Sequence, residues 1–274
     1  MYIKKIFTVA SLGILLFTLI IFSACGRFSG EAIIAAGSTS VQPFAEILAE
    51  QFMITHPGVN IDIQGGGSAA GVMAANSGTA DIGMSSRNLN TNEKNLWLVE
   101  IARDGLVVIV HPSNPIKNLT LTQVRDIYSG TTKNWDNLGS IKSKIHVVTR
   151  EDGSGTRSAF ESLVMNKVDI MPQAMVQDSN GAVRQLVADD PAAIGFISLG
   201  LVDKTVKAIE LDGVPATREH VIDGSYMLSR PFLFLTLNPP AGLVKQFIDF
   251  TLSAEGKRIL SNEGLVTLDE VPQP

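Results

Sequence analysis

Short apolar runs alternate with amphipathic stretches along most of the chain. Runs such as Glu31–Ala36 and Gly105–Val110 have the length and the β-branched content of strands. The stretch that follows the first run carries Phe44, Leu48 and Phe52 at the spacing of one helical face. Strands that alternate with helices favour an α/β fold in which helices cover both faces of the sheets.

The pattern predicts elements to near the end of the chain. Strands are expected at Glu31–Ala36, Val59–Gln64, Ala80–Met84, Gly105–Val110, Ile145–Thr149, Ala193–Ser198, Val206–Leu211 and Phe232–Leu237. Helices are expected at Phe44–Phe52, Ala69–Asn76, Glu93–Arg103, Thr120–Tyr128, Thr156–Asn166, Val183–Val187 and Gly242–Leu260. Thr120 and Gln123 form a capping box. The run before Pro112 is interpreted as a crossing between two lobes, and the closing helix is expected to pack on the first lobe.

The N-terminal stretch has the pattern of an export signal. Lys4 and Lys5 precede the uncharged run Ile6–Phe22, and small residues then lead to Cys25. About 17 apolar residues are short for a membrane span, so residues 1–24 are predicted to be a signal peptide. The alternative is an N-terminal anchor that is not cleaved.

Cys25 is the only cysteine of the chain. A disulfide within the chain is therefore impossible, and a thiolate metal site is not expected. A lone cysteine after an apolar export segment resembles the lipobox of bacterial lipoproteins, although Phe22 stands where leucine is usual. The resemblance implies cleavage before Cys25, lipidation of its thiol and an extracytoplasmic protein anchored to a bacterial cell membrane, with residues 25–30 as a tether.

Composition narrows the possible functions. The 274 residues carry a net charge of −5, and Lys and Arg are scattered. No basic run with interleaved aromatic residues suggests a nucleic-acid partner. The length suits one large domain or two lobes.

Hydroxyl residues and glycines follow several predicted strands. The main cluster lies in Thr149–Phe160, and similar clusters lie in Gly37–Ser40, Gly65–Ser68 and Ser85–Arg87. Each could be an ordinary strand-to-helix turn. However, ligands of α/β sheets bind beyond the carboxyl ends of strands, where helix N-termini also attract anions. If two lobes face each other, N–H and O–H donors with one or two arginines would suit a small tetrahedral oxyanion.

The motifs together resemble a known family, the phosphate-binding proteins (PstS) of phosphate ABC transporters, which are type II periplasmic binding proteins. The matching segments are GSTSVQPF (37–44), QGGGSAAG (64–71), ADIGMSSR (80–87), LTLTQVRDIYSGTTKNW (119–135), TREDGSGTRSAF (149–160) and AAIGFISLG (192–200). The resemblance implies two α/β lobes joined by a two-stranded hinge that close on phosphate. Lobe I is expected at 31–111 plus 232–274 and lobe II at 112–231.

The resemblance also implies a set of site residues and partners. The candidate phosphate ligands are Ser38, Thr39, Ser40, Ser68, Ser86, Arg87, Arg150, Ser154, Gly155 and Thr156. Asp152 is expected to hold Arg150, and Asp81 is a second supporting residue. The expected partners are inorganic phosphate, the permease subunits of an ABC importer and the membrane, through Cys25. We expect a monomer without cofactor or metal.

One position departs from the family. Well-known members carry an aspartate where this chain has Ser86, and that carboxylate accepts a proton from phosphate and so rejects sulfate. Asp81 or Asp152 could be the acceptor here. A receptor for sulfate, molybdate or tungstate therefore remains an alternative, as does a phosphate sensor.

An enzyme is the alternative from another class. The four histidines are separated in sequence from the serine clusters: His56, His111, His146 and His220. No GxSxG nucleophile motif and no carboxylate–histidine metal motif is evident, so we expect no hydrolase or phosphatase.

Overall fold

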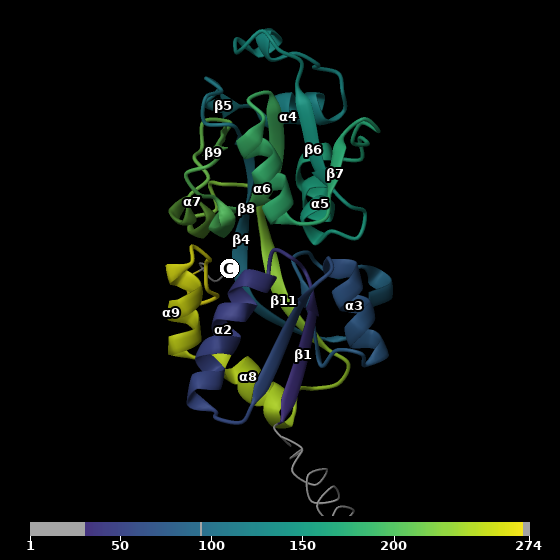
Figure 1. The fold of residues 1–274 in the computed structure, drawn as a ribbon, viewed down its shortest axis with the longest axis vertical. Coiled ribbons are helices and arrows are strands. Elements are labelled where there is room, and N and C mark those ends of the chain that lie inside the picture. The colour runs from purple at the N-terminus through teal and green to yellow at the C-terminus, as the bar shows by residue number, and fades with distance from the viewer. Residues whose placement is uncertain (1–30, 94, 271–274) are drawn as a thin grey trace, which may run out of the picture. The chain divides into compact units, whose positions relative to one another are not determined.

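The computed structural model describes residues 31–93 and 95–270 (Figure 1). Its described strands and helices alternate along most of the chain, so the fold is α/β as the apolar pattern predicted. The predicted signal peptide and the whole predicted tether, 25–30 with Cys25, lie outside the described residues. Within those residues, no helix combines the length and the apolarity that crossing a bilayer requires.

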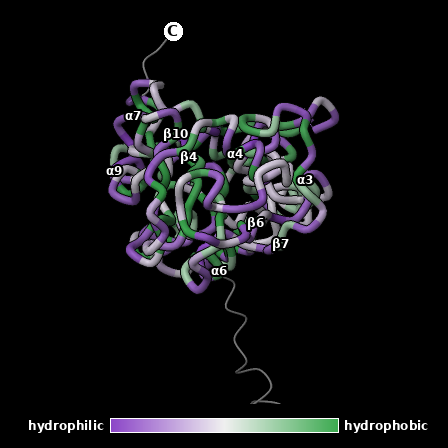
Figure 2. The backbone as a smooth tube through the Cα atoms, turned by 90° about the horizontal axis from the view of Figure 1, so that it is seen from above, coloured by the Kyte–Doolittle hydropathy of each residue, from purple (hydrophilic) through white to green (hydrophobic). Residues whose placement is uncertain are grey.

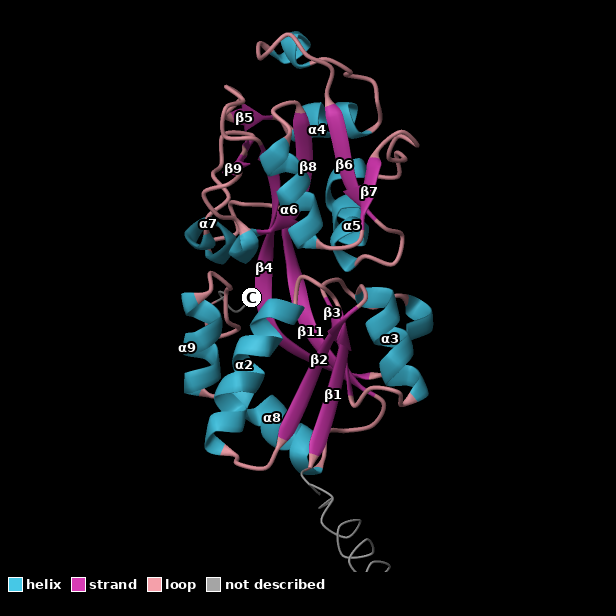
Figure 3. Cartoon of the chain, in the orientation of Figure 1, coloured by secondary structure: helices cyan, strands magenta, loops and turns pink. Residues whose placement is uncertain are grey.

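The strands of the main sheet follow the order β2-β1-β3-β11-β4-β8-β6-β7, and β9 pairs with β4. Their bounds are β1 Ala32–Gly37, β2 Asn60–Gly65, β3 Ile82–Ser85, β4 Trp97–Val110, β6 His146–Arg150, β7 Met175–Gln177, β8 Ala193–Ser198, β9 Lys207–Ala208 and β11 Ser229–Thr236. A two-stranded sheet pairs β5 Asn118–Leu119 with β10 Glu210–Leu211. Figure 3 shows these strands in magenta between the helices.

The helices are bounded by recognisable sequence signals. Their ranges are α2 Gln42–Thr55, α3 Ser68–Ser77, α4 Leu121–Tyr128, α5 Gly155–Phe160, α6 Asn180–Asp189, α7 Arg218–Ile222, α8 Gly242–Leu252 and α9 Ala254–Asn262. A π-helical turn, Glu161–Met165, continues α5. The Thr120–Gln123 capping box is present at α4, which confirms that prediction.

The N-terminal part of the described chain forms a parallel βαβαβ unit. β1 pairs in parallel with both β2 and β3, so the carboxyl ends of these three strands lie at the same edge of the sheet. Helix α2 buries Phe44, Leu48 and Phe52 against this sheet, in the same cluster as Ile33. The predicted amphipathic face is thus the face that packs.

β4 crosses from one core to another. Its residues 97–105 pair antiparallel with β11, and 106–110 pair with β8 (Figure 1). Ile101 and Ala102 belong to the cluster around Phe44, whereas Leu106 and Val108 belong to the cluster around Trp135. The predicted crossing between two lobes lies in this strand, and the boundaries at 111/112 and 231/232 stay a prediction.

The helix predicted at Glu93–Arg103 is wrong, because those residues enter β4 after a short 3₁₀ turn at Thr91–Glu93. Glu, Leu, Ala and Arg favour helices intrinsically, but pairing with β11 decides the outcome. The register also shifts opposite Phe232/Leu233, so Ile101 has no partner of its own. That bulge breaks the two-residue period by which a strand is recognised.

Two further predictions need correction. The run Val206–Leu211 splits into β9 and β10, which pair with β4 and β5 respectively. The closing helix is two helices, because Ser253 is extended and its hydroxyl accepts a hydrogen bond from Gly256 N at 3.2 Å, capping α9. Phe247 and Leu260 nevertheless pack in the Phe44 cluster, as predicted.

Hydrophobic residues form two large clusters, one on each side of the crossing. The first centres on Phe44, Phe232 and Phe247, and the second on Trp135, Phe160 and Phe196. Hydrophobic and hydrophilic segments alternate along the backbone in Figure 2, as elements with one buried face require. A lobe with its own core can move against its neighbour without losing that core.

Candidate functional site

Buried polar side chains gather where the carboxyl ends of strands from the two halves meet. Ser38 and Ser40 follow β1, Ser86 follows β3, and Thr156 lies after β6 at the start of α5. Ser68 begins α3 after the glycines that follow β2, and it is buried too. The predicted convergence of hydroxyl clusters therefore occurs in the structure.

Ser86 lies in the middle of the set of hydroxyl side chains that the first half contributes. Ser38 Oγ donates a hydrogen bond to Ser86 Oγ at 2.8 Å, and Ser86 N donates to Ser68 Oγ at 3.0 Å. Ser68 Oγ and Ser86 Oγ lie 3.4 Å apart. Hydroxyls can donate or accept, so this group can adapt to the protonation of an anion.

Ser40 links the two halves directly. Its Oγ accepts hydrogen bonds from Asn180 Nδ2 at 2.9 Å and from Arg230 Nη2 at 3.1 Å, and it lies 2.7 Å from Thr156 Oγ1. Because two N–H donors already point at Ser40 Oγ, its own proton is directed to Thr156. The Thr156 hydroxyl is then able to donate its proton elsewhere.

The start of α5 and the turn before it lie close to Ser68 and Ala69 at the start of α3. Ala69 N donates to Gly153 O at 3.0 Å. An ideal Cβ added to Gly155 would lie 2.1 Å from Ser68 Oγ and 2.6 Å from Ser86 Oγ. Only glycine therefore permits this contact between the start of α5 and the serines of the first half.

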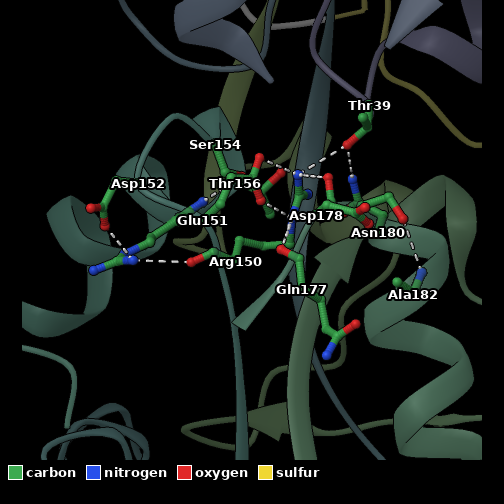
Figure 4. Close-up of polar contacts among 12 residues, drawn as sticks. Thr39, Arg150, Glu151, Asp152, Ser154, Thr156, Gln177, Asp178, Asn180 and Ala182 are labelled. Atoms are coloured by element: carbon green, nitrogen blue, oxygen red, sulfur yellow. Dashed lines mark hydrogen bonds and ion pairs between the residues drawn. The ribbon is translucent and has the colours of Figure 1, made fainter. Parts of the chain in front are cut away.

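Arg150 is the buried charge at the end of β6, with 1% of its surface exposed. Its Nε and Nη2 donate to Glu151 Oε2 at 2.8 Å and Oε1 at 2.9 Å (Figure 4). Nη2 also donates to Asp178 O at 2.9 Å and to Thr39 Oγ1 at 3.1 Å. Nη1 is buried and has no hydrogen-bond partner among the described residues. A buried guanidinium donor without a partner is costly, which makes it a contact point for an anion.

The prediction that Asp152 holds Arg150 is wrong. Asp152 pairs with Arg157 at 2.5 Å and its side chain is 93% exposed, whereas Glu151 is the carboxylate on Arg150. Glu151 and Asp152 lie in a turn in which Ser154 N donates to Glu151 O, and their carboxylates point to different arginines (Figure 4). Ser154 itself caps α5 by accepting from Arg157 N at 3.2 Å.

We call the buried hydroxyls of Ser38, Ser40, Ser68, Ser86 and Thr156 the hydroxyl cluster. In the described structure, the side chains of Arg87 and Asp81 make no hydrogen bond to it. Arg87 donates from both Nη atoms to Glu93, at 2.7 and 2.9 Å, and this hydrogen bonding lowers the pKa of Glu93. Asp81 accepts from Ile34 N at 2.8 Å just before β3 begins, a strand length away from Ser86. Neither Asp81 nor Asp152 is therefore placed to accept a proton from a bound anion.

The sequence reasoning missed Asn180, Arg230 and Asp104. Arg230 Nε and Nη2 donate to Asp104 Oδ2 at 3.0 and 2.9 Å, and both side chains are buried. Burial raises the pKa of Asp104, an effect that Arg230 and Ser198 oppose. Asp104 directly precedes the apolar run Gly105–Val110, but Glu100 and Arg103 in the same strand are charged as well, so the sequence offered no signal that singled it out.

Other chemistries find little support in this part of the chain. The four histidines bond to Thr55, Ser113, Asp190 and Thr217, which are all outside the hydroxyl cluster. Among residues 31–93 and 95–270, no three His, Cys, Asp or Glu side chains are grouped so that they could hold a metal ion.

Comparisons with known proteins point to one family. Residues 25–255 match the PBP superfamily domain. The phosphate-binding protein PstS of Bacillus subtilis (strain 168) is 30% identical over 251 residues, which cover 89% of this chain and 83% of that protein.

Solved structures agree with this relationship. A protein from Clostridium perfringens, described as a phosphate ABC transporter substrate-binding protein and solved with bound phosphate, is 43% identical with a TM-score of 0.84; the match covers 87% of this chain and 100% of that one. An ABC-type phosphate transport receptor from Vibrio cholerae is 39% identical with a TM-score of 0.72, covering 86% and 100%. The fold is therefore the two-lobed periplasmic binding protein fold, and the chain belongs to the PBP superfamily and, within it, to the PstS family of phosphate-binding proteins.

Proposed function

We propose that this protein binds inorganic phosphate between its two lobes and delivers it to the permease subunits of an ABC importer. The observation that carries the proposal is Arg150, which is buried and donates to Thr39 Oγ1 of the other half while its Nη1 has no partner in the described chain. The names of the relatives from Bacillus, Clostridium and Vibrio support phosphate as the anion.

The proposed ligand groups come from both halves. From the first half they are the hydroxyls or backbone N–H groups of Ser38, Thr39, Ser40, Ser68 and Ser86. From the second they are the guanidinium of Arg150 and the hydroxyls or backbone N–H groups of Ser154, Gly155 and Thr156. Arg87 is left out of this set because Glu93 and Asn88 O take its Nη donors. A set of neutral donors around one strong cation suits a small oxyanion.

Binding is proposed to stabilise the closed arrangement of the lobes. Phosphate would replace contacts such as Ser40–Thr156 by bridges to both halves, so that the closed state gains contacts that an open state lacks. A ligand shifts such an equilibrium only through this difference in contacts. β4 and the chain entering β11 are the two connections that would bend.

Discrimination between oxyanions must come from hydroxyls rather than from a carboxylate. Both candidate acceptors, Asp81 and Asp152, lie outside the hydroxyl cluster. Ser86 Oγ can accept a hydrogen bond from the P–OH of hydrogen phosphate by turning its own proton toward Ser68. Sulfate has no proton, so it would lose the hydrogen bond to Ser86 Oγ. It would not, however, face a repelling carboxylate. A receptor for sulfate or molybdate is therefore the second candidate.

Export and anchoring belong to the same proposal. Residues 1–24 would direct export, and the lipidated Cys25 would tether a monomer to the outer face of a bacterial membrane. The lipobox-like residues before Cys25 support this location. We propose a transport role without catalysis, and sensing without transport is the alternative.

Isothermal titration of the purified protein with phosphate, and then with sulfate, tests the proposed ligand between pH 5 and 8. We expect one phosphate per chain and weaker sulfate binding at pH 8, where the phosphate dianion predominates. Chloride at the same ionic strength controls for general anion effects. Absence of phosphate heat from folded protein would refute the proposal, and sulfate binding as tight as phosphate would favour the second candidate.

A further inference from the structure

Arg230 and Asp104 form a buried ion pair between the two crossing strands. They are register partners on β11 and β4, and their side chains are 2% and 0% exposed. A buried pair is expensive to desolvate and contributes little to stability by itself. Its position beside the hydroxyl cluster therefore calls for an explanation other than stability.

Asp104 is fully engaged by its neighbours. Oδ1 accepts from Ser198 Oγ at 2.7 Å and from Leu199 N at 3.2 Å, and Oδ2 accepts from Nε and Nη2 of Arg230. Four donors on two oxygens fix the orientation of the carboxylate. The carboxylate in turn fixes the plane of the guanidinium.

The remaining N–H groups of Arg230 face the proposed ligands. Nη2 donates to Ser40 Oγ at 3.1 Å, and Nη1 lies 3.5 Å from Ser86 Oγ. The second distance is at the limit for a hydrogen bond, so Nη1 is only weakly used by the protein. Burial lowers the pKa of Arg230, but the Asp104 carboxylate opposes this effect, and a guanidinium is basic enough to keep its charge.

We propose that Arg230 is a second cationic contact to the bound anion and that it sets the preference for the dianion, with Asp104 as the residue that positions it. This inference rests on the proposed function and adds to it the charge state of the ligand. Arg150 would approach the anion from the second half, and Arg230 would approach it from the crossing strands. With two guanidinium groups and no carboxylate directed at it, the anion needs no proton to bind.

The preference predicts a pH dependence that comes from the ligand. Phosphate changes from a monoanion to a dianion near neutral pH, so affinity should rise between pH 6 and 8. The charged groups nearest to Arg230 are Asp104 on β4 and Arg150 at the end of β6, while Glu151 is bound to Arg150. Arg87 lines the same cavity of about 220 Å³ as Arg230 and is itself paired with Glu93.

Two variants test the inference in the full chain. Arg230→Lys keeps the charge and an ion pair with Asp104 but loses the forked donor, and the double variant Arg230→Met with Asp104→Asn removes both charges together. We expect each to weaken phosphate binding about 10- to 100-fold, the range for loss of a charged hydrogen bond. In the double variant, the gain in affinity from pH 6 to 8 should also shrink.

Arg87→Lys is the matched control, because Arg87 is a second buried arginine on the same cavity and is bonded to Glu93. We expect its phosphate affinity to stay within about twofold of the parent, well below one charged bond. Thermal unfolding of all variants separates effects on folding from effects on binding. One Arg230 variant keeps the buried charges and the other removes both, so the test can be made even if only one of them folds.

The outcomes are distinguishable. If the Arg230 variants melt lower but bind phosphate as tightly, with the same pH slope, the pair is only structural and the inference is overturned. If the parent protein itself binds no phosphate, the proposed function fails instead. Weaker binding, with a flatter pH slope in the double variant and an unchanged Arg87→Lys control, supports Arg230 as the second contact.

Discussion

At the scale of single residues, the candidate site depends on what each polar group is free to do. Hydroxyls such as Ser86 and Thr156 can exchange donor and acceptor roles, whereas Arg150 can only donate. Glu151, Asp178 O and Thr39 account for most of its N–H groups, and Nη1 is left over in the described structure. Removing Arg150 should therefore weaken binding more than removing any single hydroxyl.

Arg150→Ala is expected to weaken phosphate binding about 10- to 100-fold, because a hydrogen bond to a charged group contributes about 1.5–3 kcal/mol. Thr156→Val, which removes one neutral hydroxyl, should weaken it about 2- to 10-fold. Titration calorimetry of both variants gives the comparison. Arg184→Ala, on α6 and paired with Asp203, is the control and should leave the affinity unchanged. Equal affinities of Arg150→Ala and the parent would contradict the role of Arg150.

Residue roles were only partly predictable from sequence. Arg150, Ser68 and Thr156 lie in the buried polar cluster, and their role as ligands stays a prediction. Arg87 and Asp152 do not lie there, because their nearest opposite charges are Glu93 and Arg157. Glu151 and Asp152 are adjacent carboxylates, and only the turn between β6 and α5 decides which one reaches Arg150. Pattern alone holds no information on that direction.

At the scale of elements, the site depends on how closely the start of α5 approaches the serines after β2 and β3. Gly155 is the point of contact, since a Cβ there would overlap Ser68 Oγ. Nearby, Ala69 N donates a backbone hydrogen bond to Gly153 O, which joins the start of α3 to the turn before α5. Tight packing of this kind is specific to the arrangement in which both halves meet.

Gly155→Ala is expected to weaken phosphate binding about 10- to 100-fold, since overpacking costs about 1–3 kcal/mol and falls here on the state in which the halves meet. The melting temperature without phosphate should change little, because alanine is favourable in a helix. Titration and thermal unfolding together measure both effects.

Gly181→Ala is the matched control for that variant. Gly181 also lies in the first turn of a helix, α6, and its added Cβ would meet only Ser179 Oγ, at 4.0 Å. Its affinity should equal that of the parent. Unchanged binding by Gly155→Ala would mean that the contact with Ser68 is not needed in the bound state.

Most elements were predicted within a few residues, and the failures have two causes, pairing with distant strands and one local cap. β4 contains good helix formers and a bulge at Ile101, so neither propensity nor period indicated a strand. The split of β9 from β10 and the break at Ser253 likewise depend on partners distant in sequence or on one local cap. Local pattern predicts an element well when its own residues decide its conformation.

At the scale of the whole molecule, two cores are joined by β4 and by the chain that enters β11, and the polar cluster lies where the halves meet. This arrangement lets one anion contact both halves. The predicted anchor, Cys25, precedes β1 in the sequence. Anchoring and binding should therefore be separable.

Cys25→Ser is expected to move the protein from the membrane fraction to the soluble fraction of cells, because the proposed lipid anchor needs a thiol. Fractionation followed by immunoblotting measures the distribution. Phosphate affinity of the released protein should match that of the parent. If the variant stays in the membrane fraction, the apolar segment 6–22 would be an uncleaved anchor, which is the alternative to a signal peptide.

The sequence by itself determined the α/β alternation, the strand ends that carry hydroxyls and glycines, and the family to which the motifs belong. These features are local: each depends on residues within one run or turn. The tertiary structure alone decided that Arg230 and Asp104 lie beside the hydroxyl cluster, that Glu151 rather than Asp152 holds Arg150, and that Arg87 pairs with Glu93. Those choices depend on side chains up to 190 positions apart, as in the bond from Arg230 to Ser40, and only the folded chain brings such groups into contact.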